Sequence, residues 1–243
     1  MSSRNLLVFR GLAAAFHWLI LIKRLSEDER LPAFCYLTNI VYLLCTLYYT
    51  TAVYNGLFIG EDKLPFHHTL SSNAHVFRMD KLCYEQKTAS GNLNVMRRLQ
   101  WLLHSIVLTM GILVSIMYFL LIYNPEEDIL SLTNISRHIL NSVFLLVEFT
   151  FNTLAVKFYH LVHCLVLSVC YAIYTFIFWY VVEPPENYIY RIINWGKPFR
   201  TCSLIALLMF AALILNIVLV GISKLKLRLI FPTRNPSTPS FLV

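Results

Sequence analysis

Two polar side chains in otherwise apolar stretches of the sequence could together carry out nucleophilic chemistry. Thr38 follows Pro32 by six residues and His138 follows Asn134 by four, offsets of about 9 Å and about 6 Å along a helix. A threonine hydroxyl is a weak nucleophile unless a neighbouring base accepts its proton. An uncharged imidazole is such a base, and an apolar environment favours that form. We therefore predict that Thr38 is a nucleophile and His138 its general base.

Two asparagines accompany the histidine. Asn134 and Asn141 stand four residues before and three residues after His138, so the three share one helical face. Either amide could orient the imidazole or donate to an oxyanion. Glu148, ten residues beyond His138, points roughly 80° away and lies about 15 Å deeper, which excludes it from this site. A plainer interpretation stays open, in which Thr38 bonds its own helix carbonyl and His138 holds helices together.

The remaining histidines suggest one alternative. His17 and His138 fall at one depth, and His104, His160 and His163 fall at another, as two haem groups would require. The second set lies almost at the membrane interface, where histidine is common, so we expect no cofactor. The six cysteines lack metal-type spacing, and His67, His68 and His75 belong to a polar loop. The sequence therefore predicts no metal site.

The composition shows which elements must hold these residues. Of 243 residues, 58% are hydrophobic and 14% charged, and the mean hydropathy is +0.62. So few charges cannot cover a water-facing surface, since soluble chains carry roughly 25%. The sequence predicts an all-α integral membrane protein, because about 20 apolar residues cross a bilayer as a helix. We expect one domain, residues 1–223, with six transmembrane helices at about 5–22, 32–59, 100–123, 135–156, 160–182 and 201–223.

The charges predict which way this domain faces. With six spans, the side carrying both termini holds twelve basic and four acidic residues, and the opposite side holds six and eight. The positive-inside rule then places both termini and loop 60–99 in the cytoplasm. The net charge of +7 is thus a signal of orientation, and no nucleic-acid partner is expected. Residues 224–243 form a basic tail that we expect to be disordered. Thr38 and His138 then share the outer leaflet, while Arg10, Arg137 and Glu148 lie within spans.

Two short motifs resemble a known superfamily. The run Tyr36-Leu-Thr38-Asn39, together with His138 followed ten residues later by Glu148, resembles the androgen-induced protein family of multi-pass membrane proteins. Characterised members of that family hydrolyse fatty acid esters of hydroxy fatty acids with a threonine and a histidine. By position, Thr38 matches the threonine and His138 the histidine. The resemblance implies membrane lipids as partners, with a branched fatty acid ester as substrate, in the plasma membrane or the endoplasmic reticulum.

The rolling stone branch of the same superfamily is the closer resemblance. It rests on the Leu-Thr-Asn run, on His138-x-x-Asn141-Ser142 and on the segment from Tyr188 to Pro198. That segment departs from the pattern at Arg191, where proline is expected, and at Asn194, where aspartate is expected. This branch is linked to myoblast fusion in insects. It therefore implies an alternative function, a non-enzymatic membrane protein in cell–cell fusion that meets its partner through the outer segment 183–200.

Overall fold

Six helical segments follow one another in the computed structural model, which describes residues 3–26, 32–59, 95–125, 131–152, 154–184 and 187–230. Within these ranges every regular element is helical, which confirms the predicted all-α class and the six helices. The long elements are α1 (Ser3–Leu25), α2 (Leu37–Tyr54), α4 (Val95–Met117), α6 (Asn141–Phe151), α7 (Leu161–Val181) and α8 (Pro198–Ile230).

Short turns extend four of these helices. A 3-10 turn at Ala33–Cys35 precedes α2, and a π turn at Asn55–Ile59 follows it. A π turn at Tyr118–Ile122 ends the α4 segment. The fourth segment begins with α5 (Leu132–Ile135) and a π turn at Ser136–Leu140, which run into α6, and a 3-10 turn at Phe158–His160 opens α7. The π turns matter because such turns often occur at functional sites, and one of them carries His138.

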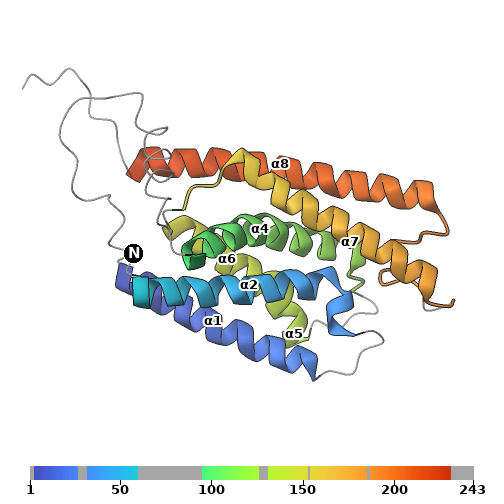
Figure 1. Cartoon of the computed structure of the whole chain (residues 1–243), viewed down its shortest axis with the longest axis horizontal. Coiled ribbons are helices and arrows are strands. Elements are labelled where there is room, and N and C mark those ends of the chain that lie inside the picture. The colour runs from blue at the N-terminus through green and yellow to red at the C-terminus, as the bar shows by residue number, and fades with distance from the viewer. Residues whose placement is uncertain are drawn as a thin grey trace, which may run out of the picture.

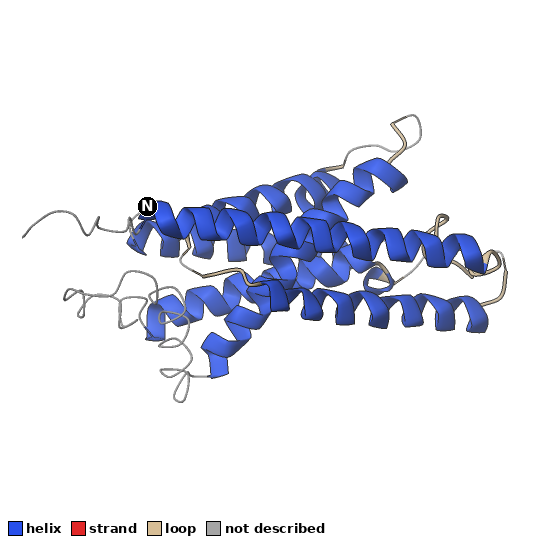
Figure 2. Ribbon diagram, turned by 90° about the horizontal axis from the view of Figure 1, so that it is seen from above, coloured by secondary structure: helices blue, strands red, loops and turns tan. Residues whose placement is uncertain are grey.

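Successive helices run in opposite directions (Figure 1), and their axes are roughly aligned (Figures 1 and 2). The start of α1 and the end of α8 therefore lie at the same end of the bundle, and the start of α2 lies at the other end (Figure 1). α4 is central, because it contacts α2, α6, α7 and α8. This arrangement brings the start of α2, the end of α4 and the start of the fourth segment to one end of the bundle.

The helices differ in whether they are long and apolar enough to cross a membrane. Within the described ranges, four helices are long and apolar enough to cross a membrane, namely Arg4–Leu25, Val95–Ile122, Phe158–Val181 and Pro198–Lys226. α2 and the α5–α6 segment are not among these four, and many of their polar side chains are buried, among them Asn39, Thr46, Asn141 and Glu148. These two segments therefore supply a large part of the polar interior, and the other helices supply the rest, for example Arg10 and His104.

Two helix boundaries differ from prediction, and one lysine contacts both regions. The fourth segment ends at Phe151 instead of near residue 156, and α8 continues to Ile230 although residues from 224 onward were expected to form a tail. The Nζ of Lys226 donates to the carbonyl oxygens of Phe149 at 2.5 Å and Asn152 at 2.9 Å. A cation near the free carbonyls at a helix end is favourable, and this contact also joins the last turns of α8 to the end of α6.

Some predictions fall on parts of the chain outside the described residues. These are most of the loop predicted at 60–99, with its three histidines, and the tail beyond residue 230. The α4 helix begins at Val95, earlier than the residue 100 that hydropathy indicated. The predicted orientation in the membrane stays a prediction.

A bulkier side chain at Gly111 is expected to destabilise the bundle. A Cβ added there would lie 2.5 Å from Cδ1 of Leu145 and 3.4 Å from Nδ2 of Asn141, so α4 and α6 approach closely because this residue is glycine. Overpacking costs about 1–3 kcal/mol, and we expect Gly111→Leu to lower the melting temperature in detergent. Gly11→Leu is the matched control, because nothing lies within 4 Å of the added Cβ. Equal melting temperatures for the two variants would contradict this packing argument.

Candidate functional site

Thr38 lies on the wall of a small, partly open cavity. The cavity has a volume of about 110 Å³ and is bordered by the start of α2, the end of α4, the middle of α7, part of α8 and the segment 190–193. Its lining is mostly apolar and includes six hydroxyl-bearing residues, Thr38, Tyr118, Ser168, Tyr171, Thr175 and Tyr190. An apolar space with a few polar groups is typical of a site for a largely hydrocarbon ligand.

Tyr171 of α7 holds the start of α2 in place. Its hydroxyl accepts a hydrogen bond from the Leu37 amide at 3.2 Å and donates to the Cys35 carbonyl at 2.8 Å. The first amides of a helix have no partner within the helix, so this phenol satisfies one of them. Asn39 completes the turn by donating to the carbonyl of Ala33 at 2.7 Å. The helix end that carries Thr38 is therefore held by hydrogen bonds from Tyr171 of α7 and from Asn39 of α2 itself.

Tyr190 approaches Thr38 from the segment between α7 and α8. Burial raises the pKa of the Tyr190 phenol, and hydrogen bonding to Thr38 and Tyr171 offsets part of that rise. The phenol therefore stays protonated at neutral pH and is available as a donor. The ring also packs edge-on against Tyr36, with centroids 5.8 Å apart. Thr38, Tyr171 and Tyr190 form a cluster of hydroxyls at one end of the cavity.

His138 lies next to this cavity, behind Tyr118. The two rings stack with centroids 3.7 Å apart and an angle of 6° between their planes, and Tyr118 itself lines the cavity. The imidazole is 4% exposed, and its Nδ1 has no hydrogen-bond partner within the described structure. The hydrogen bonds of the described residues do not join Thr38 to His138. The structure thus brings the two predicted residues to the same region. Tyr118 stacks on His138 and also lines the cavity that Thr38 lines.

The two predicted asparagines are hydrogen-bonded to side chains other than His138. Asn134 accepts from Nη2 of Arg137 at 2.6 Å, and Nη1 of that arginine donates to Oδ1 of Asn39 at 2.8 Å. Asn141 bonds through Oδ1 to Nε2 of His17 at 3.1 Å. A role for either amide in orienting His138 stays a prediction.

His17 is also relevant to the haem alternative. Its Nδ1 lies 2.7 Å from the Ala13 carbonyl oxygen, while its Nε2 bonds Asn141. The ring stacks on Tyr42 with centroids 4.8 Å apart. Because an axial haem ligand needs one free ring nitrogen, His17 in this arrangement is not suited to bind iron.

The interior of the described part of the chain contains a buried ion pair that helical spacing does not connect. Nη2 of Arg10 lies 2.8 Å from Oε1 of Glu148, and Nε lies 3.1 Å from the same oxygen. Tyr48 donates to that oxygen at 2.9 Å, and Asn152 approaches it at 3.4 Å. The pair ties α1, α2 and α6 together. The signal was present in the sequence, since Arg10 and Glu148 are oppositely charged residues within predicted spans, and such residues usually pair.

Loss of the Tyr171 hydroxyl is expected to loosen the end of α2. Tyr171→Phe leaves the Leu37 amide and the Cys35 carbonyl without their partner, which costs about 1–3 kcal/mol for buried groups. We expect faster hydrogen exchange at the amides of residues 37–40, measured by mass spectrometry in detergent. Tyr174→Phe is the matched control, because among the described residues that phenol donates to the Cys35 sulfur, at 3.1 Å, and not to the backbone of the α2 start. Equal exchange in both variants would show that the anchor lies elsewhere.

Comparison with known proteins identifies the family of this chain. The family model described as "Protein rolling stone" matches residues 6–234. The Drosophila melanogaster protein named "Protein rolling stone" is 22% identical over 134 residues, which are 53% of this chain and 49% of that protein. The chain thus spans about half the length of this curated relative. No solved structure matches.

Proposed function

This chain belongs to the rolling stone family, and we propose that it is an intramembrane hydrolase of fatty acid esters of hydroxy fatty acids. The observation that carries the proposal is the position of Thr38 on the wall of an apolar cavity, beside Tyr171 and Tyr190. A hydrocarbon substrate needs such an apolar surface, and ester cleavage needs a hydroxyl nucleophile with donors close by.

Each residue has a definite role in the proposed reaction. Oγ1 of Thr38 forms a bond to the ester carbonyl carbon, and its proton passes to Nδ1 of His138, directly or through one water. The Tyr190 phenol donates to the carbonyl oxygen as negative charge develops there. The carbon–oxygen bond of the ester breaks, and the imidazolium returns its proton to the departing alcohol. Water, deprotonated by His138, then releases the fatty acid and regenerates the threonine hydroxyl.

One atom of His138 supports this role. Its Nδ1 has no hydrogen-bond partner among the described residues, while the Tyr118 ring stacks on the imidazole and also lines the cavity. Catalytic hydrogen bonds often tighten only in the substrate complex. In the proposed complex, the Tyr118 side chain moves aside and the imidazole reaches Thr38.

We further propose that all six helices span the membrane with both termini in the cytoplasm. The start of α1 and the end of α8 lie at one end of the bundle, and the start of α2 lies at the opposite end (Figure 1). Thr38 then faces the outer leaflet of the plasma membrane or the endoplasmic reticulum membrane. A lipid ester reaches it laterally from that leaflet.

A direct assay tests the hydrolase proposal. The purified full-length chain in proteoliposomes is given the palmitoyl ester of hydroxystearate, and released palmitate is measured by mass spectrometry. A fluorophosphonate probe is added in parallel, and the labelled peptide is identified. We expect release of palmitate and a label on Thr38. Absence of palmitate release would overturn the proposal.

A second function is favoured by a different feature, the segment 183–200, which ends in the first turn of α8. Phe199, in the first turn of α8, is 88% exposed, and it lies in the segment 183–200 that the rolling stone resemblance associates with cell–cell fusion. A fusion role predicts that Phe199→Ser abolishes fusion of cultured myoblasts that depend on this protein, while palmitate release is unchanged. Fusion that depends on the Thr38 hydroxyl instead would favour the hydrolase as the agent.

A further inference from the structure

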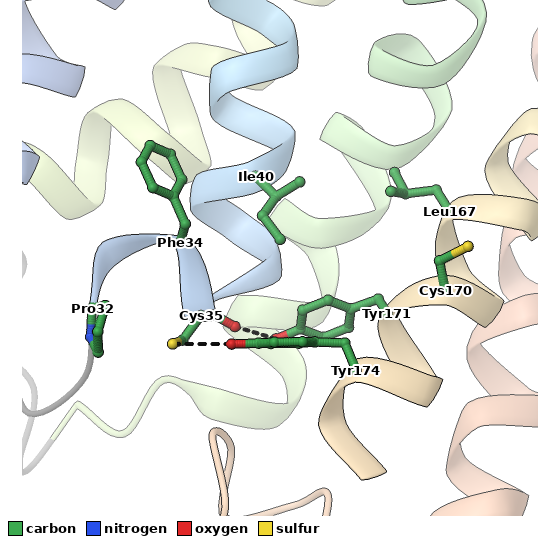
Figure 3. Close-up of a pocket in the computed structure, with 8 residues that line it drawn as sticks. All are labelled: Pro32, Phe34, Cys35, Ile40, Leu167, Cys170, Tyr171 and Tyr174. Atoms are coloured by element: carbon green, nitrogen blue, oxygen red, sulfur yellow. Dashed lines mark hydrogen bonds between the residues drawn. The ribbon is translucent and has the colours of Figure 1, made fainter. Parts of the chain in front are cut away.

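A second apolar space opens beside the Thr38 cavity. It is a groove of about 430 Å³ between the segment that begins at Pro32 and the outer face of α7 (Figure 3). Its lining includes Pro32, Phe34, Ile40, Leu167, Cys170 and Tyr171. Sites for small molecules have volumes of about 300–1,000 Å³. The groove reaches that range and the Thr38 cavity, at about 110 Å³, does not.

One side chain borders both the groove and the cavity. Tyr171 lines both spaces, so the groove and the cavity meet at this residue. The Tyr171 ring is held there by the bond of its hydroxyl to the Cys35 carbonyl, which Figure 3 shows as a dashed line. The groove therefore adjoins the cavity whose wall carries Thr38.

The chemistry of the groove selects hydrocarbon. Its two phenols, Tyr171 and Tyr174, both direct their hydroxyls to Cys35, one to the carbonyl oxygen and one to the sulfur (Figure 3). Their ring carbons are what remains for a ligand to contact. The neighbouring face of α7 exposes apolar side chains such as Val169 and Ile173, which face bilayer hydrocarbon if α7 spans the membrane. A polar headgroup would lose its hydration here without finding partners.

We propose that this groove binds the acyl arm of the lipid ester whose carbonyl lies at Thr38, and that it sets the preferred length of that arm. This inference rests on the proposed hydrolase function. The small cavity accepts only a short segment next to the carbonyl, and the groove holds the longer chain. Selectivity for long acyl arms then depends on the α7 face of the groove and not on the reacting residues.

Filling the groove tests this proposal. Cys170→Trp places a large ring in the groove, and the palmitoyl and butyryl esters of the same hydroxystearate are compared as substrates. We expect the ratio of palmitoyl to butyryl turnover to fall about tenfold or more, because the loss of a few methylene contacts changes selectivity by that order. Ile173→Trp is the matched control: it adds the same ring to the same helix on its exposed face outside the groove lining. An unchanged ratio in Cys170→Trp would overturn the proposal.

Failure of the hydrolase proposal is distinguishable from failure of this one. If the wild-type chain cleaves neither ester, the hydrolase proposal fails, and binding is measured alone. A palmitoyl ester with a diazirine at the chain end is photo-crosslinked in proteoliposomes, and we expect labelled peptides from residues 32–40 and 167–174. Cys170→Leu, a smaller filling, should reduce that label if the tryptophan variant does not fold. Equal competition by excess phosphatidylcholine would overturn the proposal, because it would show ordinary bilayer contact.

Discussion

Thr38→Val abolishes ester hydrolysis if this residue is the nucleophile. Valine has nearly the shape of threonine but no hydroxyl, so the cavity wall keeps its form while the attacking atom is lost. Removal of a catalytic nucleophile lowers turnover by roughly a thousandfold or more. We expect palmitate release from the hydroxystearate ester to fall to the background of protein-free vesicles. Thr38→Ser, which keeps the hydroxyl, should retain a measurable part of the activity.

The same helix supplies the matched control. Thr46 is also a buried threonine of α2, but its hydroxyl donates to the Tyr42 carbonyl and it does not line the cavity. Thr46→Val should leave turnover unchanged. His138→Phe keeps a ring to stack on Tyr118 and removes the base, so turnover should fall by about a hundredfold to ten-thousandfold. Full activity in Thr38→Val would exclude the threonine mechanism, whatever the result for His138.

The second large effect concerns stability and arises from the Arg10–Glu148 ion pair. Glu148 is fully buried and Arg10 is 3% exposed, so Glu148→Leu leaves a guanidinium inside the bundle without its carboxylate. Removal of one partner from a buried pair costs about 3–5 kcal/mol, against about 0–1 kcal/mol for an exposed pair. We expect the free energy of unfolding in mixed micelles to fall by the larger amount.

A double-mutant cycle separates the pair from the general effect of substitution. The double variant Arg10→Leu with Glu148→Leu contains neither charge, so it should be more stable than Glu148→Leu alone. Tyr48 loses its acceptor in both variants, and this cost cancels in the comparison. Strictly additive losses would show that the two side chains do not depend on each other for stability.

Much of the helical scaffold was predictable because its signals are local. Long apolar stretches give helices in a membrane protein since each helix satisfies its own backbone hydrogen bonds, and the six predicted segments correspond to six observed ones. The helix ends were less predictable. Lys226 binds the end of α6 from a position more than seventy residues away, and no local pattern contains that contact.

The candidate site shows the same division between local and distant information. Thr38 and His138 could be selected from the sequence because a hydroxyl and an imidazole are costly in apolar helices. The residues that surround Thr38 and His138 in space could not be selected from the sequence. Asn141 shares a helical face with His138, yet it bonds His17 of another helix. Tyr118, Tyr171 and Tyr190 come from three separate segments, and aromatic residues are too frequent here for spacing to single them out.

The sequence by itself determined that this protein is helical and hydrophobic, and it identified the polar residues whose burial requires an explanation. Only the tertiary structure decided what each of them contacts: Arg10 with Glu148, Asn141 with His17, His138 with Tyr118, and Thr38 with the cavity. The physical reason is that hydropathy and helix formation depend on neighbours in the chain. Hydrogen bonds, ion pairs and cavities depend on how helices pack, and that packing brings together residues that are far apart in sequence.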